Sequence, residues 1–166
     1  MSAHRHRLVS QPQTALCMLL IATITAGCGG SQKYLKTKSD PLLEYTRTPC
    51  FGPCPAYKLE VQADGQARYV GRSNVTNIGE YSGQWTPAQL REVATMAGEV
   101  QLSSKAGNYD NPLIMDLPAT RLTLGKYRVL DRVNGPDLDQ LYGTLDSLIG
   151  ITVWSKVSAT NAPKKR

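Results

Sequence analysis

A run of alternating apolar and polar residues constrains the fold of this chain more than any other feature. In residues 57–63 (YKLEVQA) every second side chain is apolar, and those between are charged or polar. This period of two is typical of a β-strand with one face on a core and the other in water. Asp64-Gly65 follows, a strong two-residue hairpin turn, and residues 67–71 (ARYVG) are predicted to return as the partner strand.

Similar patterns predict two more strands and a helix next to this hairpin. Short strands are expected at 43–46, before the hairpin, and at 78–85, after it. Thr86 suits the N-cap of a helix, with Pro87 in the first turn and Gln89 able to complete a capping box. The apolar face of this helix is predicted to consist of Leu90, Val93, Ala94 and Ala97.

The remainder of the chain is predicted to contain a second hairpin and a second helix. Residues 101–118 show no sustained period and are predicted to be a loop. A hairpin is expected over 122–131, with its turn at Gly125-Lys126. The last helix is predicted to begin near Asp137 and to end at Gly150. Its apolar face is expected to contain Leu138, Leu141, Leu145, Leu148 and Ile149.

Together these elements indicate a single α+β domain over residues 41–157. Their order is ββββ-α-ββ-α, which implies an antiparallel sheet of about six strands with both helices on one face. No glycine-rich loop follows a strand and opens a helix, so we expect neither a nucleotide site nor any other cofactor.

The first 27 residues have the features of a signal peptide. A short basic start precedes an apolar run at 15–24, which is shorter than the about 20 residues that span a bilayer. Thr25-Ala26-Gly27-Cys28 then resembles the lipobox of bacterial lipoproteins, although an aliphatic residue is more common in place of Thr25. Cys28 is therefore the predicted lipidation site. The alternative is an ordinary secretory signal that ends near a cysteine.

Both ends of the mature chain are predicted to lie outside the fold. Residues 28–40 are expected to form the acylated N-terminus and a flexible tether, and residues 158–166 a disordered basic tail. Two or three acyl chains, palmitate among them, would hold the protein on a membrane, because one chain alone binds only marginally. Resemblance to sorted lipoproteins, with Gly29 after the cysteine, implies the outer membrane, facing the periplasm, if the source is Gram-negative.

Composition excludes several classes of function. Both histidines, His4 and His6, lie in the predicted signal peptide, so the mature chain lacks the histidine that Ser-His-Asp triads and Cys-His pairs require. The net charge of +6 suggests nucleic-acid binding, but residues 40–157 hold 11 Lys or Arg and 13 Asp or Glu, a balance of −2. Since a nucleic-acid binder carries positive charge on its folded domain, we expect no nucleic-acid partner.

Only Cys50 and Cys54 remain as thiols in the mature chain. Extended chain would put their α-carbons about 13 Å apart, whereas a disulfide needs roughly 4.4–6.8 Å. Gly52-Pro53 can make the required turn, so a structural disulfide is predicted for an exported protein. A redox-active pair is the alternative, although redox motifs usually have two residues between the cysteines rather than three. Two thiolates are half of a closed zinc site, so no metal is expected.

The cysteine segment also resembles a known family. CFGPCPAYKLEVQADGQARYVG is similar to the opening of an uncharacterised domain family of bacterial envelope lipoproteins, with the motif Arg-Thr-x-Cys-Phe-Gly-x-Cys-Pro-x-Tyr. The matching positions are Arg47, Thr48, Cys50, Phe51, Gly52, Cys54, Pro55, Tyr57, Asp64, Gly65, Tyr69 and Gly71. The resemblance covers most of 42–150. It implies export and a shared fold, and it supplies no activity.

The leading functional hypothesis is a lipid-anchored cell-envelope protein that acts as a non-enzymatic binding or structural module, with an envelope protein or the cell wall as its partner. Phe51, Tyr109, Asp110 and Asp116 form the candidate partner surface. The first alternative is a thiol–disulfide redox accessory that uses Cys50 and Cys54. A further alternative is a hydrolase in which Asp110 and Asp116 share the acid and base roles.

Overall fold

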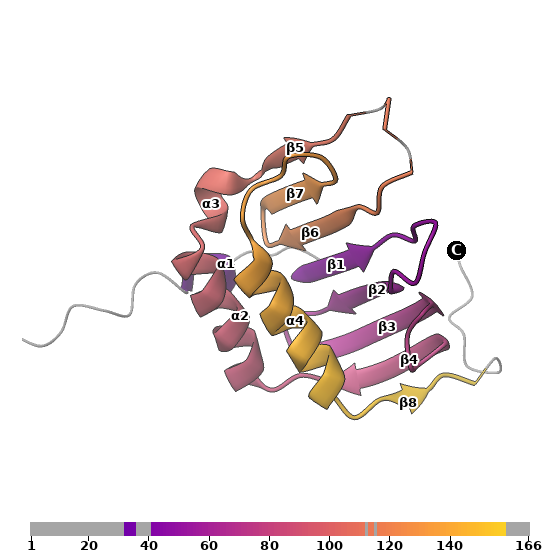
Figure 1. The fold of residues 1–166 in the computed structure, drawn as a ribbon. Coiled ribbons are helices and arrows are strands. Elements are labelled where there is room, and N and C mark those ends of the chain that lie inside the picture. The colour runs from indigo at the N-terminus through magenta and orange to yellow at the C-terminus, as the bar shows by residue number, and fades with distance from the viewer. Residues whose placement is uncertain (1–31, 36–40, 112, 115, 159–166) are drawn as a thin grey trace, which may run out of the picture.

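The computed structural model describes residues 32–35, 41–111, 113–114 and 116–158. The predicted signal peptide, Cys28 and all but the first residue of the predicted tail lie outside these residues. The described part forms one open sheet of eight strands, with four helices (Figure 1). The strands are β1 (Leu43–Arg47), β2 (Ala56–Val61), β3 (Gln66–Ser73), β4 (Gly79–Gln84), β5 (Gly107–Tyr109), β6 (Thr120–Leu124), β7 (Tyr127–Asp131) and β8 (Ser155–Lys156). The helices are α1 (Gln32–Leu35), α2 (Pro87–Glu99), α3 (Leu102–Lys105) and α4 (Asp139–Ile151).

The sheet has the order β5-β7-β6-β1-β2-β3-β4-β8. Six of its neighbouring pairs are antiparallel, and β5 pairs with β7 in parallel. The prediction of an α+β fold is confirmed, but the prediction of about six strands is wrong. Because β5 has three residues and β8 has two, neither is long enough to show an alternation in the sequence.

Two short helices were also absent from the prediction. The segment 101–118, expected to be a loop, contains α3 and β5. Part of the expected tether, residues 32–35, forms α1, where Tyr34 is fully buried and its hydroxyl donates to the carbonyl of Ala97 at 3.1 Å. Residues 32–35 are therefore not part of a free tether, because the side chain of Tyr34 packs on the domain. Among the described residues, no helix is long and apolar enough to span a membrane.

The β2–β3 hairpin forms as predicted, and Gly65 is essential to its turn. Gly65 has a φ of +86°, a conformation that side chains with a Cβ rarely adopt. Its carbonyl accepts from the backbone N–H of Trp85 at 2.8 Å. A Cβ at this position would lie 2.1 Å from the carbonyl oxygen of Trp85. The turn therefore requires glycine both for its backbone angles and for this close approach.

Helices α2 and α4 cover one face of the sheet (Figure 1). The capping box predicted at the start of α2 is present: Gln89 N–H donates to the Thr86 hydroxyl, and the Gln89 side chain accepts from the Thr86 N–H. Helix α4 begins at Asp139 and ends at Ile151, one residue past the predicted stop at Gly150. The chain leaves the helix at Thr152, whose backbone is extended. The buried side chains of the two helices are Leu90, Val93, Ala94, Ala97, Leu141, Tyr142, Leu145 and Leu148.

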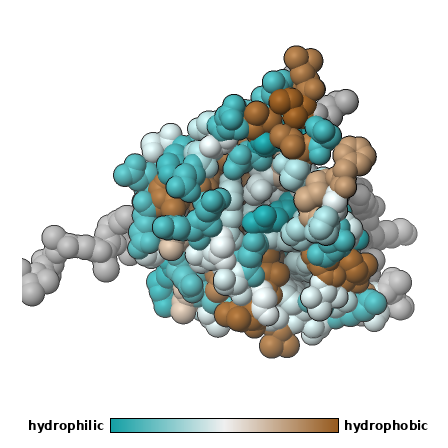
Figure 2. Space-filling model, viewed as in Figure 1, coloured by the Kyte–Doolittle hydropathy of each residue, from teal (hydrophilic) through white to brown (hydrophobic). Residues whose placement is uncertain are grey.

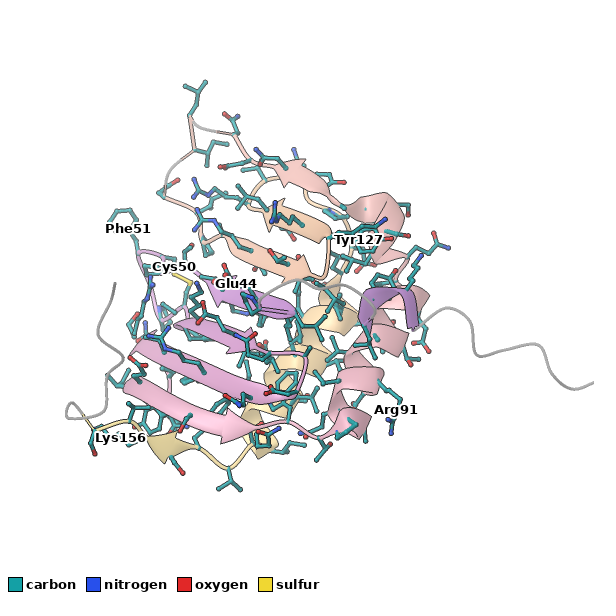
Figure 3. All side chains as sticks on the ribbon, turned by 180° about the vertical axis from the view of Figure 1, so that it is seen from behind. Glu44, Cys50, Phe51, Arg91, Tyr127 and Lys156 are labelled. Atoms are coloured by element: carbon teal, nitrogen blue, oxygen red, sulfur yellow. A yellow bond between two sulfur atoms is a disulfide. The ribbon has the colours of Figure 1, made fainter. Side chains whose placement is uncertain are left out.

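The opposite face of the sheet carries a row of charged side chains (Figure 3). Lys58 on β2 pairs with Glu44 on β1 at 3.1 Å and with Glu60 at 2.8 Å. Arg68 on β3 pairs with Glu60 at 3.2 Å and with Glu80 on β4 at 2.7 Å. Charges of alternating sign thus run across four adjacent strands, with Val70 among them. The buried Leu43, Leu59 and Tyr69 of the same strands point to the helices.

Candidate functional site

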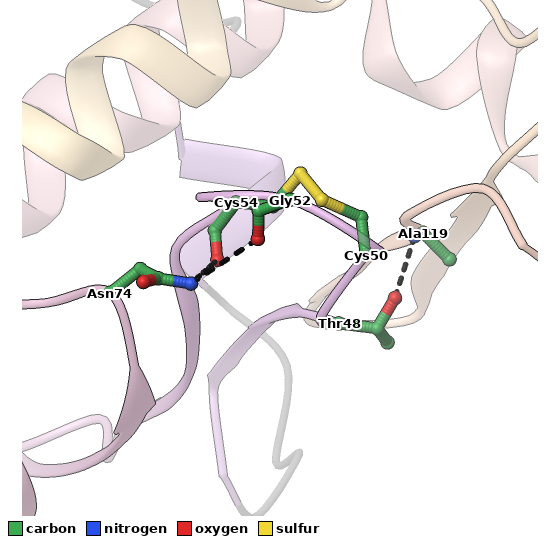
Figure 4. The surroundings of a disulfide bond; sticks show 6 residues. All are labelled: Thr48, Cys50, Gly52, Cys54, Asn74 and Ala119. Carbon is green, nitrogen blue, oxygen red and sulfur yellow. Dashed lines mark hydrogen bonds between the residues drawn. A yellow bond between two sulfur atoms is a disulfide. The ribbon is translucent and has the colours of Figure 1, made fainter.

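The Cys50–Cys54 disulfide closes the loop between β1 and β2 (Figure 4). The two α-carbons are 5.7 Å apart, as the predicted turn requires. On one side, the amide of Asn74 in the β3–β4 loop donates to the carbonyl of Cys54 at 3.0 Å. On the other, the hydroxyl of Thr48 accepts from the N–H of Ala119 at 2.7 Å. The disulfide loop is therefore joined to both neighbouring loops.

A row of tyrosines crosses the sheet beneath α4. Tyr45, Tyr57, Tyr69 and Tyr81 come from β1, β2, β3 and β4 in turn, and consecutive ring centroids are 5.8, 5.6 and 6.5 Å apart. Trp154, which follows α4, lies 5.3 Å from the ring of Tyr69. It can do so because Gly83 on β4 has no side chain; a Cβ there would lie 2.9 Å from the indole.

One ion pair links this aromatic row to α4. Arg47 donates to Asp146 on α4 at 2.7 Å and to the hydroxyl of Tyr45 at 2.8 Å. The hydroxyl of Tyr57 donates to the other oxygen of Asp146. The alternation of β1 places Tyr45 and Arg47 on the helix face, and the register pairs Arg47 with Tyr57. Asp146 therefore joins β1, β2 and α4 through one carboxylate.

The environment of these tyrosines keeps them protonated. Burial, with Asp146 and Tyr81 adding to it, raises the pKa of Tyr69 to about 12. Burial is also the main reason that the pKa values of Tyr45, Tyr57 and Tyr142 lie well above that of a free tyrosine. Burial alone would lower the pKa of Arg47, but its neighbours Tyr45, Asp146 and Tyr57 raise it. At neutral pH the phenols are hydrogen-bonding groups and not bases or nucleophiles.

A cavity of about 380 Å³ opens beside this cluster, between the end of α4 and the β3–β4 loop. We call it the aromatic pocket. It is lined by Pro55, Tyr57, Tyr69, Val75, Thr76, Asn77, Asp146, Ile149, Gly150, Thr152 and Trp154. Its volume lies near the lower end of the range of about 300–1,000 Å³ for small-molecule sites. Because Pro55 directly follows Cys54, the disulfide loop forms part of its rim.

The residues of the predicted partner surface lie at the same end of the sheet, on different loops. Phe51 is 96% exposed at the tip of the disulfide loop (Figure 3). Asp116 is exposed in the β5–β6 connection, where Leu113 is 90% exposed and apolar atoms gather at the tip of the molecule (Figure 2). Tyr109 and Asp110 lie at the end of β5, and the strands β6 and β7 separate β5 from β1.

Tyr109 and Asp110 have structural contacts of their own. Tyr109 is half-buried against the core, and its hydroxyl donates to the carbonyl of Lys105 at 3.1 Å. Asp110 forms an ion pair with Arg132 at 3.5 Å, and the two facing atoms are shielded from solvent. Arg132 also donates to the carbonyl of Ile114 at 3.3 Å. Within the described residues, no three His, Cys, Asp or Glu side chains gather as a metal site requires.

The sequence interpretation did not identify the aromatic pocket. The sequence marks Tyr57 as a strand residue and a motif position, and it does not single out Asp146 or Trp154. One signal was available: the chain has eight tyrosines and a single phenylalanine. Phenylalanine packs as well as tyrosine in a core, and a buried tyrosine hydroxyl needs a hydrogen-bond partner. The excess of tyrosine therefore indicates a hydrogen-bonded aromatic site.

The chain belongs to the family described as "Domain of unknown function (DUF6438)", which matches residues 41–149. This match confirms the resemblance to an uncharacterised domain family and covers all strands but β8. No curated protein matches the chain.

Proposed function

We propose that this member of the DUF6438 family is a non-enzymatic binding module whose binding site is the aromatic pocket. The observation that carries the proposal is the combination of that cavity with three aromatic rings and a single carboxylate along its wall. Small-molecule sites have this composition, with an apolar lining and a few polar groups that fix the orientation of the ligand.

The state of the polar groups favours binding over catalysis. The pKa values of the pocket tyrosines are raised, mainly by burial, so neither Tyr57 nor Tyr69 is a base at neutral pH. Asp146 is held by Arg47 and Tyr57, which suits a fixed acceptor better than a group that exchanges protons. The same argument disfavours the hydrolase alternative. In this proposal Asp110 is the ion-pair partner of Arg132 and does not act as an acid or a base.

The setting proposed for this module is the cell envelope. In this proposal Cys28 carries the acyl chains, the signal peptide is removed, and the domain faces the periplasm of a Gram-negative source. The lipobox-like sequence at 25–28 supports this assignment. Labelled palmitate should be incorporated into the wild-type protein and be absent from a Cys28→Ser variant. Equal incorporation in both would contradict the anchor.

The binding function is tested with the acylated full chain in its native envelope. The protein is purified without washing out small molecules, and bound compounds are identified by mass spectrometry. Gly150 lines the pocket, and no atom lies within 4 Å of a Cβ built there, so Gly150→Leu is chosen to extend a side chain from open space at the pocket. Gly143, two helical turns earlier and equally unobstructed, supplies the control Gly143→Leu.

We expect a compound that accompanies the wild type and Gly143→Leu and is lost from Gly150→Leu. If no compound distinguishes the two leucine variants, the pocket is not a binding site.

The rival thiol–disulfide function rests on the half-exposed disulfide beside Phe51. Alkylation of thiols in intact cells tests it, because a redox accessory must show a reduced fraction of Cys50 and Cys54.

A further inference from the structure

We infer that the aromatic pocket takes the ring of a neutral saccharide. This inference rests on the binding function proposed above and names the class of ligand. Three properties of the pocket lead to it: its aromatic wall, its balance of charge, and its remaining capacity for hydrogen bonds.

Trp154 is the part of the aromatic wall that a ligand can reach. Trp154 is half-buried, and its indole is tilted by 36° against the ring of Tyr69, with 5.3 Å between centroids. Tyr69 and Tyr57, whose ring centroids are 5.6 Å apart, lie behind the indole and are 3% and 5% exposed. The C–H faces of a sugar ring carry slight positive charge and are attracted to the negative faces of aromatic rings. The half-buried indole of Trp154 can thus take one face of a pyranose ring.

The charges of the pocket argue against an ionic ligand. Asp146 is the only charged side chain in the lining, so no lysine or arginine is present there to hold a phosphate or carboxylate. A cation would need the negative charge of Asp146, but Arg47 already contacts that carboxylate at 2.7 Å. The pair of Asp146 and Arg47 has no net charge, so it attracts an entering cation only weakly. A neutral ligand avoids both difficulties.

Polar groups around the wall can still accept and donate hydrogen bonds. A carboxylate has about four acceptor positions, and Arg47 and Tyr57 each occupy one on Asp146. The side chain of Asp146 is 42% exposed, so a ligand hydroxyl can reach the others. Asn77 contributes an amide, with a donor and an acceptor, and Thr76 a hydroxyl. Several hydroxyls beside an apolar ring face are the defining chemistry of a saccharide.

The test follows tryptophan fluorescence while ligands are added to the acylated full chain. The protein is kept in a polyoxyethylene detergent, because detergents with sugar headgroups would compete. The chain has two tryptophans, and Trp85 is 1% exposed, so a ligand in the pocket reports through Trp154. The neutral probes are glucose, N-acetylglucosamine and their β-1,4-linked disaccharides. Choline is the cationic probe and glucose 6-phosphate the anionic one.

We expect a saturable fluorescence change with at least one neutral probe. The dissociation constants of choline and glucose 6-phosphate should be higher by about tenfold or more, a difference of about 1.4 kcal/mol. Gly150→Leu should weaken saccharide binding by about tenfold or more, and Gly143→Leu should leave it unchanged. Tighter binding of choline or of the phosphate ester than of every neutral probe would overturn the inference, as would a response that Gly150→Leu leaves intact.

The two proposals can fail separately. Recovery of a pocket-dependent compound from the envelope that is not a saccharide, together with no response to the neutral probes, overturns the ligand class and leaves the binding function standing. Absence of any pocket-dependent compound together with no response to any probe overturns both.

Discussion

Asp146 is the residue through which the helical layer contacts the aromatic row of the sheet. It accepts from Arg47 and Tyr57, which come from two adjacent strands, and its side chain borders the aromatic pocket. Because a hydrogen bond to a charged group contributes more than one between neutral groups, this trio should have a measurable effect on folding.

Removal of one hydroxyl tests this effect. Tyr57→Phe should lower the free energy of unfolding by about 1–2 kcal/mol, because one oxygen of Asp146 loses its donor in a partly buried place. Urea unfolding of the purified protein measures the change. Tyr81→Phe is the matched control, since the Tyr81 hydroxyl donates at 3.4 Å to a carbonyl at the surface. Its effect should stay below about 0.5 kcal/mol. Equal losses in the two variants would contradict the role assigned to Tyr57.

The buried tyrosines also predict the response to alkaline pH. Tyrosine in an unfolded chain has a pKa of about 10, whereas burial raises the pKa of Tyr69 to about 12. Between these values the folded state binds more protons than the unfolded state, so stability falls as pH rises. The contribution is complete below about pH 10 and is lost toward pH 12. Tyr45, Tyr57 and Tyr142, with pKa values also raised, act in the same direction.

The urea midpoint should therefore fall between about pH 10 and about pH 12. Tyr69→Phe cannot ionise, and its midpoint should fall less steeply over the same range. A midpoint that rises, or a variant that matches the wild type, would show that Tyr69 is not protected from ionisation.

Among the elements, the β2–β3 hairpin follows most directly from the sequence. Its alternation and its Asp-Gly turn both act over a few residues, as does the capping box of α2. Elements that tertiary contacts stabilise could not be predicted in this way. The two residues of β8 pair with β4 although about 70 residues separate them, and the four residues of α1 dock through Tyr34.

In the candidate site, too, the features set by nearby residues could be predicted, and those set by tertiary contacts could not. The disulfide could be predicted because its cysteines are four residues apart. The pocket could not, because Asp146 follows Tyr57 by 89 residues and no local pattern links them. Gly150 resembled a helix stop, but α4 continues because its last turn is closed by the Thr152 N–H, which donates to Leu148 at 3.1 Å.

The hairpin turn gives a prediction at this scale. Gly65→Ala should lower the free energy of unfolding by more than about 2 kcal/mol, because φ is +86° and the new Cβ would meet the carbonyl of Trp85. Gly98→Ala, in α2 with open space around it, should raise stability by about 0.5–1 kcal/mol. Thermal unfolding followed by circular dichroism separates the two. The turn does not require glycine if both variants shift in the same direction.

The disulfide loop gives a second prediction at the scale of the secondary-structure elements. Replacement of both Cys50 and Cys54 by serine should lower the free energy of unfolding by about 2 kcal/mol, as the closure of a five-residue loop implies. The variant should keep its fold, because Asn74 and Thr48 still hold the loop on both sides. Guanidinium unfolding measures the loss. Unchanged stability would mean that the disulfide has no structural role.

At the scale of the whole molecule, the two ends of the sheet differ. The β1–β2, β3–β4 and β5–β6 loops lie at one end, with Phe51, Leu113 and the rim of the aromatic pocket. Helix α1 lies at the other end, where the ring of Tyr34 is 5.3 Å from that of Tyr127 beside the β6–β7 turn (Figure 1). The start of α1 at Gln32 is four positions after Cys28 in the sequence, at most about 14 Å of extended chain.

If Cys28 carries the proposed anchor, the membrane should therefore be nearer to the β6–β7 turn than to the loop end. A fluorophore on Lys126→Cys should be quenched by quenchers attached to lipids more strongly than one on Leu113→Cys, in vesicles that carry the acylated protein. Both positions are exposed, and the disulfide cysteines do not react with the label. Stronger quenching at position 113 would place the loop end on the membrane.

The position of β1 in the sheet constrains the order of folding. Its neighbour β2 follows within nine residues, but its other neighbour β6 begins at Thr120, 73 residues after β1 ends. During synthesis from the N-terminus, the first four strands exist before β6 does. Until then β1 has a free edge at what becomes the centre of the sheet, open to pairing with another chain. In the exported chain, early oxidation of Cys50 and Cys54 would hold β1 beside β2 throughout this interval, while the other edge of β1 stays open until β6 arrives.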